Sequence, residues 1–527
     1  MKLYRALAVE LRAAGTEVVF ALMGDGNLDL LAACDDAGIR VVRGRHENQV
    51  VAMADGYGRH TGRPGVASVT HGPGLTNAIT ALACASANGS HLVVLVGDTS
   101  TDDPGHVQNL DQERLVVATG VWSDRPLDPR AALTAVRSAL IGPGPTTVHL
   151  PVDVQHRTAE PLVVDHRAVP PGRPPRRLLP DPCVEDAVSL LQGAQRPFVL
   201  AGRGSIDGDG PAAIARLADV LGAPIGTTLL AKGLLPDHPR QLGVVGGIGH
   251  DDAHRRLARA DVVVAAGASL NRFTTDGGRL IGPDTAIVQI DVDRARLGRN
   301  IPIAVGLHGG VAATADAISE RLTPRDAEQC ELRRSPGAVL GALRSVLPPD
   351  PVVVIDGGHF NVAAATDLDV RDPRDFLWAA DLGTVGQGLG MAIGAAVGSD
   401  RRVTLVCGDG GFLMCSSELD TAVREQLDLL VVVLDDGAYG QEVHILDGKG
   451  HPSDLARFDT PDLAAMARAV GARGVGIDPA RPDTFLALRG ALAEPGPVVA
   501  HARIDPHPPN RTIAPYLAAL ASAGRCA

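Results

Sequence analysis

Short, uninterrupted apolar runs alternate along this chain with stretches whose apolar residues recur at helical spacing. Runs of this kind lie within residues 18–24, 65–74, 91–98 and 146–153. They lack the alternation of apolar and polar residues that a half-exposed strand shows, so they are predicted to be strands buried on both faces. The pattern therefore predicts an α/β fold in which helices cover both faces of parallel sheets.

Two breaks divide this pattern into three blocks. Residues 168–182 read AVPPGRPPRRLLPDP, and proline at this density cannot continue a helix or a central strand, so a linker is predicted there. A second break falls near residues 323–350 and closes with VLPPDPV. The sequence thus predicts three consecutive doubly wound parallel-sheet domains, over residues 1–165, 183–325 and 340–527.

Composition and charge narrow the classes of partner. The 527 residues are 45% hydrophobic, 21% charged and only 3% aromatic, with a formal net charge of −12 and no long basic stripe. Nucleic-acid and membrane partners are therefore not expected. No apolar run is long enough to span a membrane, and the first residues predict an amphipathic helix rather than a signal peptide. Seven scattered cysteines, without a metal-type cluster, indicate a reduced, cytoplasmic protein.

Two acidic turns in the third block carry the sharpest chemical signal. The apolar run 402–407 ends in Gly408-Asp409-Gly410-Gly411, a helix is predicted from about Ser416 to Glu425, and the next run ends in Asp435-Asp436-Gly437. Ligands bind at the carboxyl ends of strands in open α/β sheets. Asp409 and Asp436 lie 27 residues apart, the length of one turn–helix–turn–strand unit, so they predict a hard-oxygen site suited to Mg²⁺. Gly410 and Gly411 would let a diphosphate approach the backbone. Asp-Gly turns are common on their own, but two of them, each after a buried strand, favour a site.

This pair of turns resembles the cofactor motif of thiamine diphosphate enzymes, and more specifically that of the acetolactate synthase/pyruvate decarboxylase family. The resemblance implies that Asp409, the side chain of Asp436 and the backbone carbonyl of Ala438 ligate Mg²⁺. The family usually has Asn-Asn where this chain has Asp435-Asp436. Two unit charges about 5 Å apart repel by roughly 3 kcal/mol at an effective dielectric constant of about 20. A directly coordinated divalent ion should outweigh this repulsion, so we expect cofactor binding to survive with a stronger metal dependence.

The first block supplies an independent match. Residues 46–66, HENQVVAMADGYGRHTGRPGV, resemble the family segment in which a glutamate hydrogen-bonds the N1′ atom of the cofactor's aminopyrimidine ring and so promotes its activation. By this resemblance Glu47 takes that role. A helix-capping or surface glutamate is the alternative that the residue alone leaves open.

Two neighbouring loops add further candidates. Residues 70–77, THGPGLTN, resemble the family's Gly-Pro-Gly loop, in which Gly74 and Asn77 would contact the cofactor. Many members have serine at the position of His71, so His71 is a candidate acid, base or substrate contact, with a structural histidine as the open alternative. The segment His106-Val107-Gln108 resembles the place where synthases have an active-site glutamine, which makes Gln108 a candidate.

The third block contains two more matching segments. Residues 381–396, DLGTVGQGLGMAIGAA, resemble the glycine-rich segment that precedes the metal motif. By that resemblance Val385, beside Thr384, would wedge between the two rings of the cofactor and keep it bent. After the metal loop, Tyr439 and Gly440 would line the cofactor. Glu442 stands six residues after Asp436, where pyruvate decarboxylase-like members have a proton-relaying glutamate; a solvated helix residue is the alternative.

Two other glycine runs could mislead. Gly24-Asp25-Gly26 has Ala52 27 residues after its aspartate, so it lacks a second metal ligand and instead resembles the Gly-Asp-x-Asn-Leu segment of decarboxylase-like members. Gly202-Arg203-Gly204 lacks the third glycine of a dinucleotide motif, because position 207 is Asp. Some synthases bind FAD in their central unit; nothing in this sequence demands it, so FAD is not an expected cofactor, although that alternative stays open.

The resemblance implies an enzyme that uses thiamine diphosphate and Mg²⁺ to make or break a carbon–carbon bond next to a carbonyl. Its expected reaction is decarboxylation of a 2-oxo acid, followed by aldehyde release or by carboligation to a second small-molecule carbonyl substrate. In this family the cofactor lies between the first unit of one subunit and the third unit of another, which implies a homodimer or homotetramer.

Two alternatives remain open. Little sequence follows residue 511, which leaves little length for the extended tail of many synthases, and so an acetolactate synthase-type transferase is the second expectation. A cofactor-binding protein without turnover is the alternative of another class. The Asp435-Asp436 pair is its only support, and Glu47, which serves activation rather than binding, argues against it.

Overall fold

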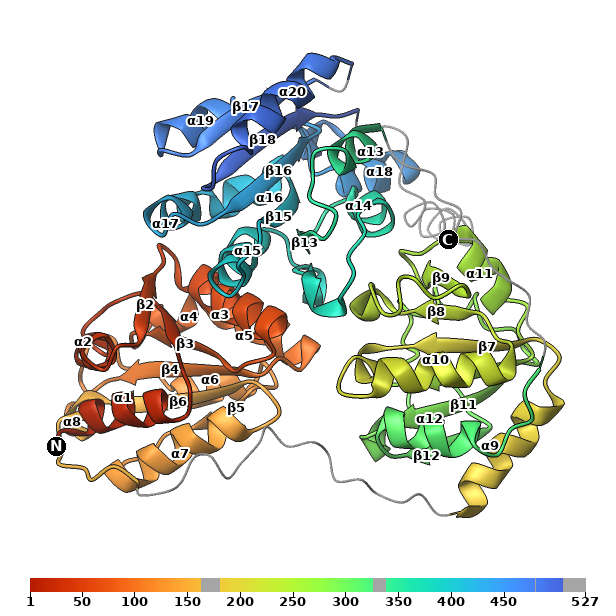
Figure 1. Ribbon diagram of the computed structural model, residues 1–527. Helices are drawn as coiled ribbons and strands as arrows, with labels where there is room; N and C mark the ends of the chain where they lie inside the picture. The colour runs from red at the N-terminus through yellow and green to blue at the C-terminus, as the bar shows by residue number, and fades with distance from the viewer. Residues whose placement is uncertain (163–180, 326–337, 479, 506–527) are drawn as a thin grey trace. The chain divides into compact units, whose positions relative to one another are not determined.

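A computed structural model describes residues 1–162, 181–325, 338–478 and 480–505. The predicted linker at 168–182 lies outside these residues except for its last two positions, and residues 511–527 lie outside them entirely. The described chain contains three six-stranded sheets whose paired strands run parallel, with helices between the strands (Figure 1). The predicted fold class is therefore confirmed.

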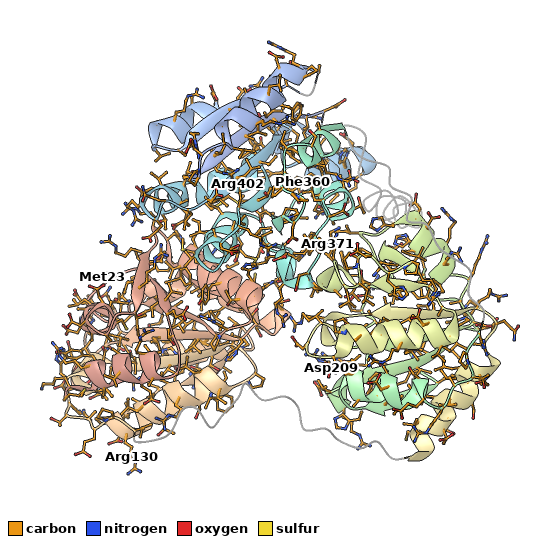
Figure 2. The ribbon with its side chains drawn as sticks, in the orientation of Figure 1. Met23, Arg130, Asp209, Phe360, Arg371 and Arg402 are labelled. Carbon is orange, nitrogen blue, oxygen red and sulfur yellow. The ribbon has the colours of Figure 1, made fainter. Side chains whose placement is uncertain are left out.

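The contacts within the chain group the three sheets into two compact units. Unit 1 holds the first and the third sheets, and unit 2 holds the second sheet together with residues 360–376. In each unit side chains fill the space between the sheets and the helices that cover them (Figure 2). None of the helices in the described residues combines the length and the apolar character needed to cross a membrane.

The first sheet of unit 1 has the strand order β2-β1-β3-β4-β6-β5. Its strands are β1 (Val18–Ala21), β2 (Arg40–Arg43), β3 (Gly65–Val69), β4 (Leu92–Asp98), β5 (Trp122–Asp124) and β6 (Thr146–Pro151). Its helices are α1 (Leu3–Ala13), α2 (Leu28–Asp36), α3 (Glu47–Thr61), α4 (Pro73–Thr76), α5 (Ile79–Asn88), α6 (Gln112–Val117), α7 (Pro129–Ile141) and α8 (Val152–Gln155). Because β1, β3 and β4 are neighbours, the loops that follow them meet at one edge of the sheet.

The third sheet has the strand order β14-β13-β15-β16-β18-β17. Its strands are β13 (Val352–Ile355), β14 (Phe376–Trp378), β15 (Val403–Gly408), β16 (Leu429–Asp435), β17 (Arg473–Ile477) and β18 (Val498–Arg503). The helices of this part of the chain are α13 (Ala338–Arg344), α14 (Asn361–Asp367), α15 (Gly388–Val397), α16 (Asp409–Cys415), α17 (Leu419–Arg424), α18 (Gly440–Gly448), α19 (Leu463–Ala469) and α20 (Pro482–Ala491). Arg402, labelled in Figure 2, pairs with Asp428 at 2.7 Å at the start of β15, and Asp409 follows its other end.

One helix boundary differs from the prediction. The helix after β15 was expected to begin near Ser416, but α16 begins at Asp409, and a 3₁₀ turn (Ser416–Glu418) then links it to α17. A carboxylate in the first turn of a helix is favoured by the helix dipole. Asp409 therefore starts the helix, and the two glycines that follow it do not delay the start.

The first and third sheets of unit 1 share one hydrophobic core. A single cluster of buried residues includes Val50 and Met53 of α3 together with Ile393 of α15 and Val431 of β16. Helices α3 and α15 cross with their backbones in contact, since a Cβ atom on Gly394 would lie only 1.8 Å from the carbonyl oxygen of Met53. This packing fixes the start of α3 relative to the third sheet.

Unit 2 contains the second sheet, in the order β12-β11-β10-β7-β8-β9. Its strands are β7 (Pro197–Ala201), β8 (Ile225–Thr227), β9 (Gln241–Val244), β10 (Val262–Ala266), β11 (Ala286–Asp291) and β12 (Val305–His308), and its helices include α9 (Asp181–Gly193), α10 (Gly210–Leu221), α11 (Asp251–Leu257) and α12 (Val311–Ser319). A Cβ atom on Gly202 would lie 2.3 Å from the carbonyl oxygen of Gly267, and one on Gly204 would lie 2.8 Å from the Cα atom of Gly267. The contact between these two loops accounts for the Gly202-Arg203-Gly204 run by packing.

Candidate active site

Glu47 opens helix α3 at the carboxyl edge of the first sheet. The ring of His46 caps this helix by accepting a hydrogen bond from the N–H of Asn48 at 3.1 Å. The side-chain amide of Asn77 donates to Glu47 Oε2 at 3.0 Å, and Glu47 remains partly exposed. The structure thus brings together two of the residues that the sequence assigned to the cofactor.

His71 is buried at the edge of the first sheet where the loops after β1, β3 and β4 meet. Its side chain is 3% exposed, and Thr70 Oγ1 lies 3.2 Å from its Nδ1 atom. A Cβ atom on Gly26 would lie 2.4 Å from the same nitrogen. The close approach of this loop to the histidine ring explains the glycine at position 26 without a metal.

The surroundings of His71 keep its ring neutral. Burial and the neighbouring ring of His106, whose centroid lies 5.3 Å away, lower the pKa of His71. The carboxylates of Asp25 and Asp98 and a hydrogen bond with the Gln108 side chain oppose this shift without reversing it. A neutral imidazole in this position can accept a proton from a bound substrate, and the structure places Gln108 against it.

The acidic turns after β15 and β16 lie side by side, because these two strands are paired up to Gly408 and Leu434. Asp409 is 1% exposed, and the hydroxyl of Thr460 donates to its Oδ2 atom. Burial, the hydrogen bond with Asp435 and the charge of Asp436 raise the pKa of Asp409 to about 7. Burial likewise raises the pKa of Asp436 to about 6. The surroundings of both carboxylates thus disfavour their ionised form.

Asp435 and Asp436 differ in their hydrogen-bond partners. Asp435 is held by His501, whose Nε2 atom lies 2.8 Å from its Oδ2, and by the N–H of Gly437 at 2.9 Å. Burial opposes ionisation of Asp435, but these hydrogen bonds outweigh it and lower its pKa. The Oδ2 atom of Asp436 is buried and has no hydrogen-bond partner, although His359 Nδ1 lies 3.2 Å away. Of the two aspartates, Asp436 is the one with an oxygen left to bind a cation.

The donor set fits a divalent ion that is shared with a phosphate group. Among the residues that the structure describes, no group of three or more His, Cys, Asp or Glu side chains is arranged to hold a metal by itself. Mg²⁺ usually takes one or two carboxylates and completes its octahedral shell with phosphate oxygens and water. Asp409, Asp436 and the backbone at Ala438 match that requirement, and they do not match a metal enclosed by protein alone.

Glycines at the acidic turns let neighbouring side chains pack close to the backbone. A Cβ atom on Gly410 would lie 2.9 Å from the Tyr439 ring, and one on Gly440 would lie 2.2 Å from Asp436 Oδ2. Tyr439 packs against Phe458 with ring centroids 5.2 Å apart. The glycines at the start of α16 and α18 are thus required by the close packing of the Tyr439 ring and the Asp436 carboxylate against these turns.

The loop that carries Thr384 and Val385 lies against the start of α16. A Cβ atom on Gly411 would lie 3.1 Å from Val385 Cγ1, and Val385 is 42% exposed. The hydroxyl of Thr384 donates to the backbone oxygens of Ala379 and Asp381 at 3.1 and 3.0 Å. Thr384 therefore shapes the loop, and Val385 is presented at its surface.

Asp356, which follows β13, holds the same loop through hydrogen bonds to its backbone. Its carboxyl group is fully buried and accepts the N–H of Gly386 at 2.9 Å and that of Gly357 at 2.9 Å. Burial raises the pKa of Asp356 to about 6, although these N–H groups and those of Gln387 and Gly388 oppose the shift. The residues on both sides of Val385 are thus fixed to the third sheet.

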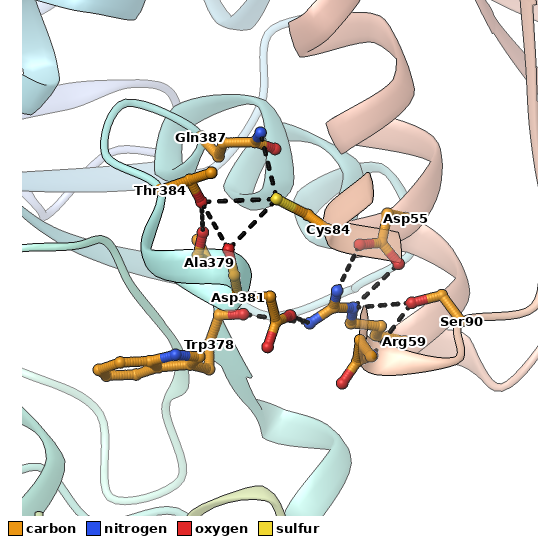
Figure 3. A network of polar contacts seen from close by, with 10 residues as sticks. Asp55, Arg59, Cys84, Ser90, Trp378, Ala379, Asp381, Thr384 and Gln387 are labelled. Carbon is orange, nitrogen blue, oxygen red and sulfur yellow. Dashed lines mark hydrogen bonds and ion pairs between the residues drawn. The ribbon is translucent and has the colours of Figure 1, made fainter. Parts of the chain in front are cut away.

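A buried polar network ties this loop to the first sheet (Figure 3). Arg59 of α3 binds Asp55 through two nitrogens at 2.9 and 2.6 Å, and binds Asp381 at 2.7 Å. Its guanidinium also donates to the carbonyl oxygen of Trp378 at 3.1 Å. The thiol of Cys84 donates to the carbonyl oxygen of Asp381 at 3.2 Å. Figure 3 shows these side chains converging between α3 and the segment that leads to Val385.

The candidate residues form two groups within unit 1. Glu47, His71, Gly74, Asn77 and Gln108 belong to the first sheet. The third sheet gathers the others, namely Thr384, Val385, Gly408, Asp409, Gly410, Gly411, Asp436, Ala438, Tyr439, Gly440 and Glu442. Glu442 lies in the first turn of α18 and is exposed. In the described part of the chain, no hydrogen bond or ion pair joins Glu47 to the second group.

Sequence reasoning missed some of the residues that shape the site. Asp356 follows the buried run of β13, as Asp409 follows that of β15, so the same signal could have found it. His501 and Arg59 gave no such signal. One lies inside a strand and the other inside a helix, and only the packing brings them to Asp435 and Asp381.

Comparison with protein families finds three matches along the chain. Residues 1–115 match the model of the thiamine pyrophosphate enzyme N-terminal TPP binding domain. Residues 184–318 match the central domain of the same enzymes, and residues 356–502 match their C-terminal TPP binding domain. Both groups of candidate residues thus fall within segments described as TPP binding.

Individual relatives are similar over nearly their whole length. The acetolactate synthase isozyme 2 large subunit of Escherichia coli is 30% identical, over 94% of this chain and 94% of its own. A probable 2-ketoarginine decarboxylase of Pseudomonas aeruginosa is also 30% identical, over 87% of this chain and 86% of its own. A solved thiamine diphosphate-dependent 4-hydroxybenzoylformate decarboxylase of Rhodococcus jostii RHA1 superposes with a TM-score of 0.83 at 24% identity, over 96% of this chain and 99% of its own.

Proposed function

This chain belongs to the thiamine pyrophosphate enzyme family, and from that premise we propose that it decarboxylates a 2-oxo acid and releases an aldehyde or joins the remaining fragment to a second carbonyl compound. The observation that carries the proposal is the pair of buried acids after β15 and β16. One of them, Asp436, has a buried oxygen without a hydrogen-bond partner, next to the glycines that open α16 and α18. Bound thiamine diphosphate would supply a carbanion to attack the substrate carbonyl and an electron sink for the bond that breaks.

Mg²⁺ is the proposed metal, with Asp409, Asp436 and the carbonyl of Ala438 as its protein ligands. A divalent ion would satisfy the buried Oδ2 atom of Asp436 and would offset the burial and the neighbouring acidic groups that raise the pKa of Asp409 to about 7. Gly408, Gly410, Gly411, Tyr439 and Gly440 would surround the diphosphate, and Thr384 and Val385 would support the ring system.

Proton movement would be shared between residues of the first sheet and Glu442 of the third. Glu47 would hydrogen-bond the pyrimidine nitrogen and hold the proton that activation requires, with Asn77 orienting its carboxylate at 3.0 Å. His71, which burial keeps neutral, would accept or return a proton at the substrate, assisted by Gln108. Glu442 would supply the proton for product release. These groups favour a reaction that ends in protonation.

We further propose that the active sites lie between subunits of a homodimer or homotetramer. The support is that Glu47, Val385 and Glu442 are at least partly exposed, and that no hydrogen bond or ion pair joins Glu47 to the second group in the described part of one chain. Mixing Glu47→Gln chains with Asp409→Ala chains tests this proposal. Sites shared between chains would regain activity in the mixed dimer, whereas sites within one chain would stay inactive.

A cytoplasmic location is also a proposal. Its support is the scattered cysteines, of which the five in the described residues are free: Cys34, Cys84, Cys183, Cys407 and Cys415. Reduced thiols of this kind persist in a reducing compartment. Fractionation of the native host would test it, and recovery of the protein outside the cytoplasm would contradict it.

The function is tested by measuring CO₂ release from a panel of 2-oxo acids, with thiamine diphosphate and Mg²⁺, beside a Glu47→Gln control. Release by the wild type alone would support decarboxylation and identify the donor. A hydroxyketone product carrying an acetyl group would instead favour the synthase-type transferase, in line with the 30% identical Escherichia coli relative. Cofactor binding without any acceleration of hydrogen–deuterium exchange at the cofactor's C2 atom would point to a binding protein without turnover.

A further inference from the structure

A buried carboxylate of the third sheet binds the backbone directly before Glu47. Glu418 ends the 3₁₀ turn after α16, and none of its surface is exposed. Its Oε1 atom accepts the N–H of Arg45 at 2.8 Å and the N–H of His46 at 2.8 Å. Its Oε2 atom accepts the hydroxyl of Thr421 at 2.8 Å. One carboxylate thus takes the last two amide groups that precede the first residue of α3.

The loop is shaped for this contact. Gly44 precedes Arg45, and a Cβ atom there would lie 2.5 Å from Val50 Cγ2 and 3.6 Å from both oxygens of Glu418. A side chain at position 44 would clash with Val50, so glycine allows the loop to pass between the Glu418 carboxylate and helix α3. Because the helix begins at Glu47, the direction of its first side chain depends on where these two amides are held.

Two other polar contacts between the same segments are ion pairs of exposed arginine side chains. Arg45 pairs with Asp420 at 2.6 Å and Arg40 pairs with Glu425 at 2.6 Å, and both arginines are about half exposed. Exposed pairs of this kind contribute little to stability, and they hold side chains rather than backbone. Glu418 differs because it is buried and binds the amides themselves, where hydrogen bonds to a charged group are strong.

We propose that Glu418 is a positioning residue that sets the place of the Glu47 carboxylate by fixing the N–H groups of Arg45 and His46. This inference rests on the role proposed for Glu47. It assigns a function in the activation step to a third-sheet residue that follows the metal motif and touches neither metal nor cofactor.

The experiment compares Glu418→Ala and Glu418→Gln with the wild type, and with Asp420→Asn as the matched control. Asp420→Asn weakens the exposed ion pair on the neighbouring helix and leaves the buried amide contacts intact. Glutamine keeps one carbonyl oxygen for the two amides and can donate to the Thr421 hydroxyl, so it should rescue the alanine variant. Two quantities are measured on the full chain: amide hydrogen exchange of residues 45 and 46 without cofactor, and C2 exchange of bound thiamine diphosphate per occupied site.

In Glu418→Ala we expect the protection of the two amides from exchange to fall at least tenfold. The C2 exchange rate should fall by about 10- to 100-fold, because a displacement of the Glu47 carboxylate by about 1 Å can slow the reaction that much. Thiamine diphosphate affinity should change less than threefold, and Glu418→Gln and Asp420→Asn should stay within threefold of the wild type in C2 exchange. Unchanged amide protection, or a C2 rate that falls only in proportion to cofactor occupancy, would overturn the inference. If the wild type and Glu47→Gln accelerate C2 exchange equally, the proposed function itself fails, while the amide measurement still reports on the contact.

Discussion

Replacing Arg59 by methionine removes the cation that joins helix α3 to the loop before Val385. Arg59 is 11% exposed, and its partners Asp55 and Asp381 are 3% and 13% exposed. Burial alone would lower the pKa of Arg59, but the two carboxylates raise it. The network is therefore a buried cation between two anions, and methionine fills a similar volume without the charge.

The cost follows from the burial of the carboxylates that remain. Removing one partner of a buried ion pair costs about 3–5 kcal/mol, because an uncompensated charge is left behind. An exposed pair contributes about 0–1 kcal/mol. We expect Arg59→Met to lose about 3–5 kcal/mol, and we expect a variant that also carries Asp55→Leu and Asp381→Leu to recover most of it, since an apolar replacement of the whole network leaves no buried charge.

The chain offers a convenient reporter for this measurement. It contains two tryptophans, Trp122 and Trp378, and both belong to unit 1. In a Trp122→Phe background, urea unfolding followed by fluorescence reports on Trp378, whose carbonyl oxygen accepts a hydrogen bond from Arg59. Arg63→Met is the control, because the pair of Arg63 with Glu17 is more than half exposed on both sides. A loss below 1 kcal/mol for Arg59→Met, or a triple variant no more stable than the single one, would refute the reasoning.

Three further predictions concern charge, pH and packing. Asp436→Asn restores the residue usual in the family, so the ratio of thiamine diphosphate affinities measured by calorimetry with and without Mg²⁺ should fall by about tenfold; an unchanged ratio would contradict the charge argument. The pKa of Asp356 is raised to about 6, so the folded chain binds more protons than the unfolded chain between about pH 4 and 6, and stability from this group is lost as pH rises through 6. The free energy of unfolding of the wild type, minus that of Asp356→Asn, should fall by about 3 kcal/mol from pH 4 to pH 7 in urea titrations, and a flat difference would contradict the burial of a titrating carboxyl. Gly394→Ala places a methyl group 1.8 Å from the Met53 carbonyl oxygen, whereas Gly490→Ala meets no atom within 4 Å; thermal unfolding should show a loss of about 1–3 kcal/mol or more for the first and no loss for the second.

The strands and the acids at their ends could be predicted from the sequence because both are local signals. An uninterrupted apolar run indicates a buried strand, and an acid directly after it must lie at the carboxyl edge of the sheet. The positions of Asp409 and Asp436 at this edge follow from the sequence alone. The sequence does not distinguish Asp435 from Asp436 on physical grounds, because the difference depends on His501 of β18, a strand that joins β16 from more than sixty residues away.

The contacts that orient the site could not be predicted in this way, because they join segments more than three hundred residues apart. Gln49, two residues after Glu47, donates to the carbonyl oxygen of Gly386 at 2.7 Å and accepts the N–H of Gly390 at 3.0 Å. A glutamine in the first turn of helix α3 carries no sign of such partners in the sequence. The same is true of Glu418. Its sequence position suggests an ordinary helix residue, and only the packing of the third sheet against the first brings it to the N–H groups of Arg45 and His46.

Together these contacts have a mechanical consequence for the proposed dimer. Gln49, Arg59 and Glu418 tie α3 and the residues just before it to the Val385 loop and to the 3₁₀ turn after α16 of the same chain. If each active site takes Glu47 from one subunit and Val385 from the other, every chain holds half of two different sites on one packed core. Docking of two such chains would then complete both sites in one step, because neither half can move into place without the other. Precision at each site would come from packing inside unit 1, and the subunit interface would only have to set the distance between two preformed halves.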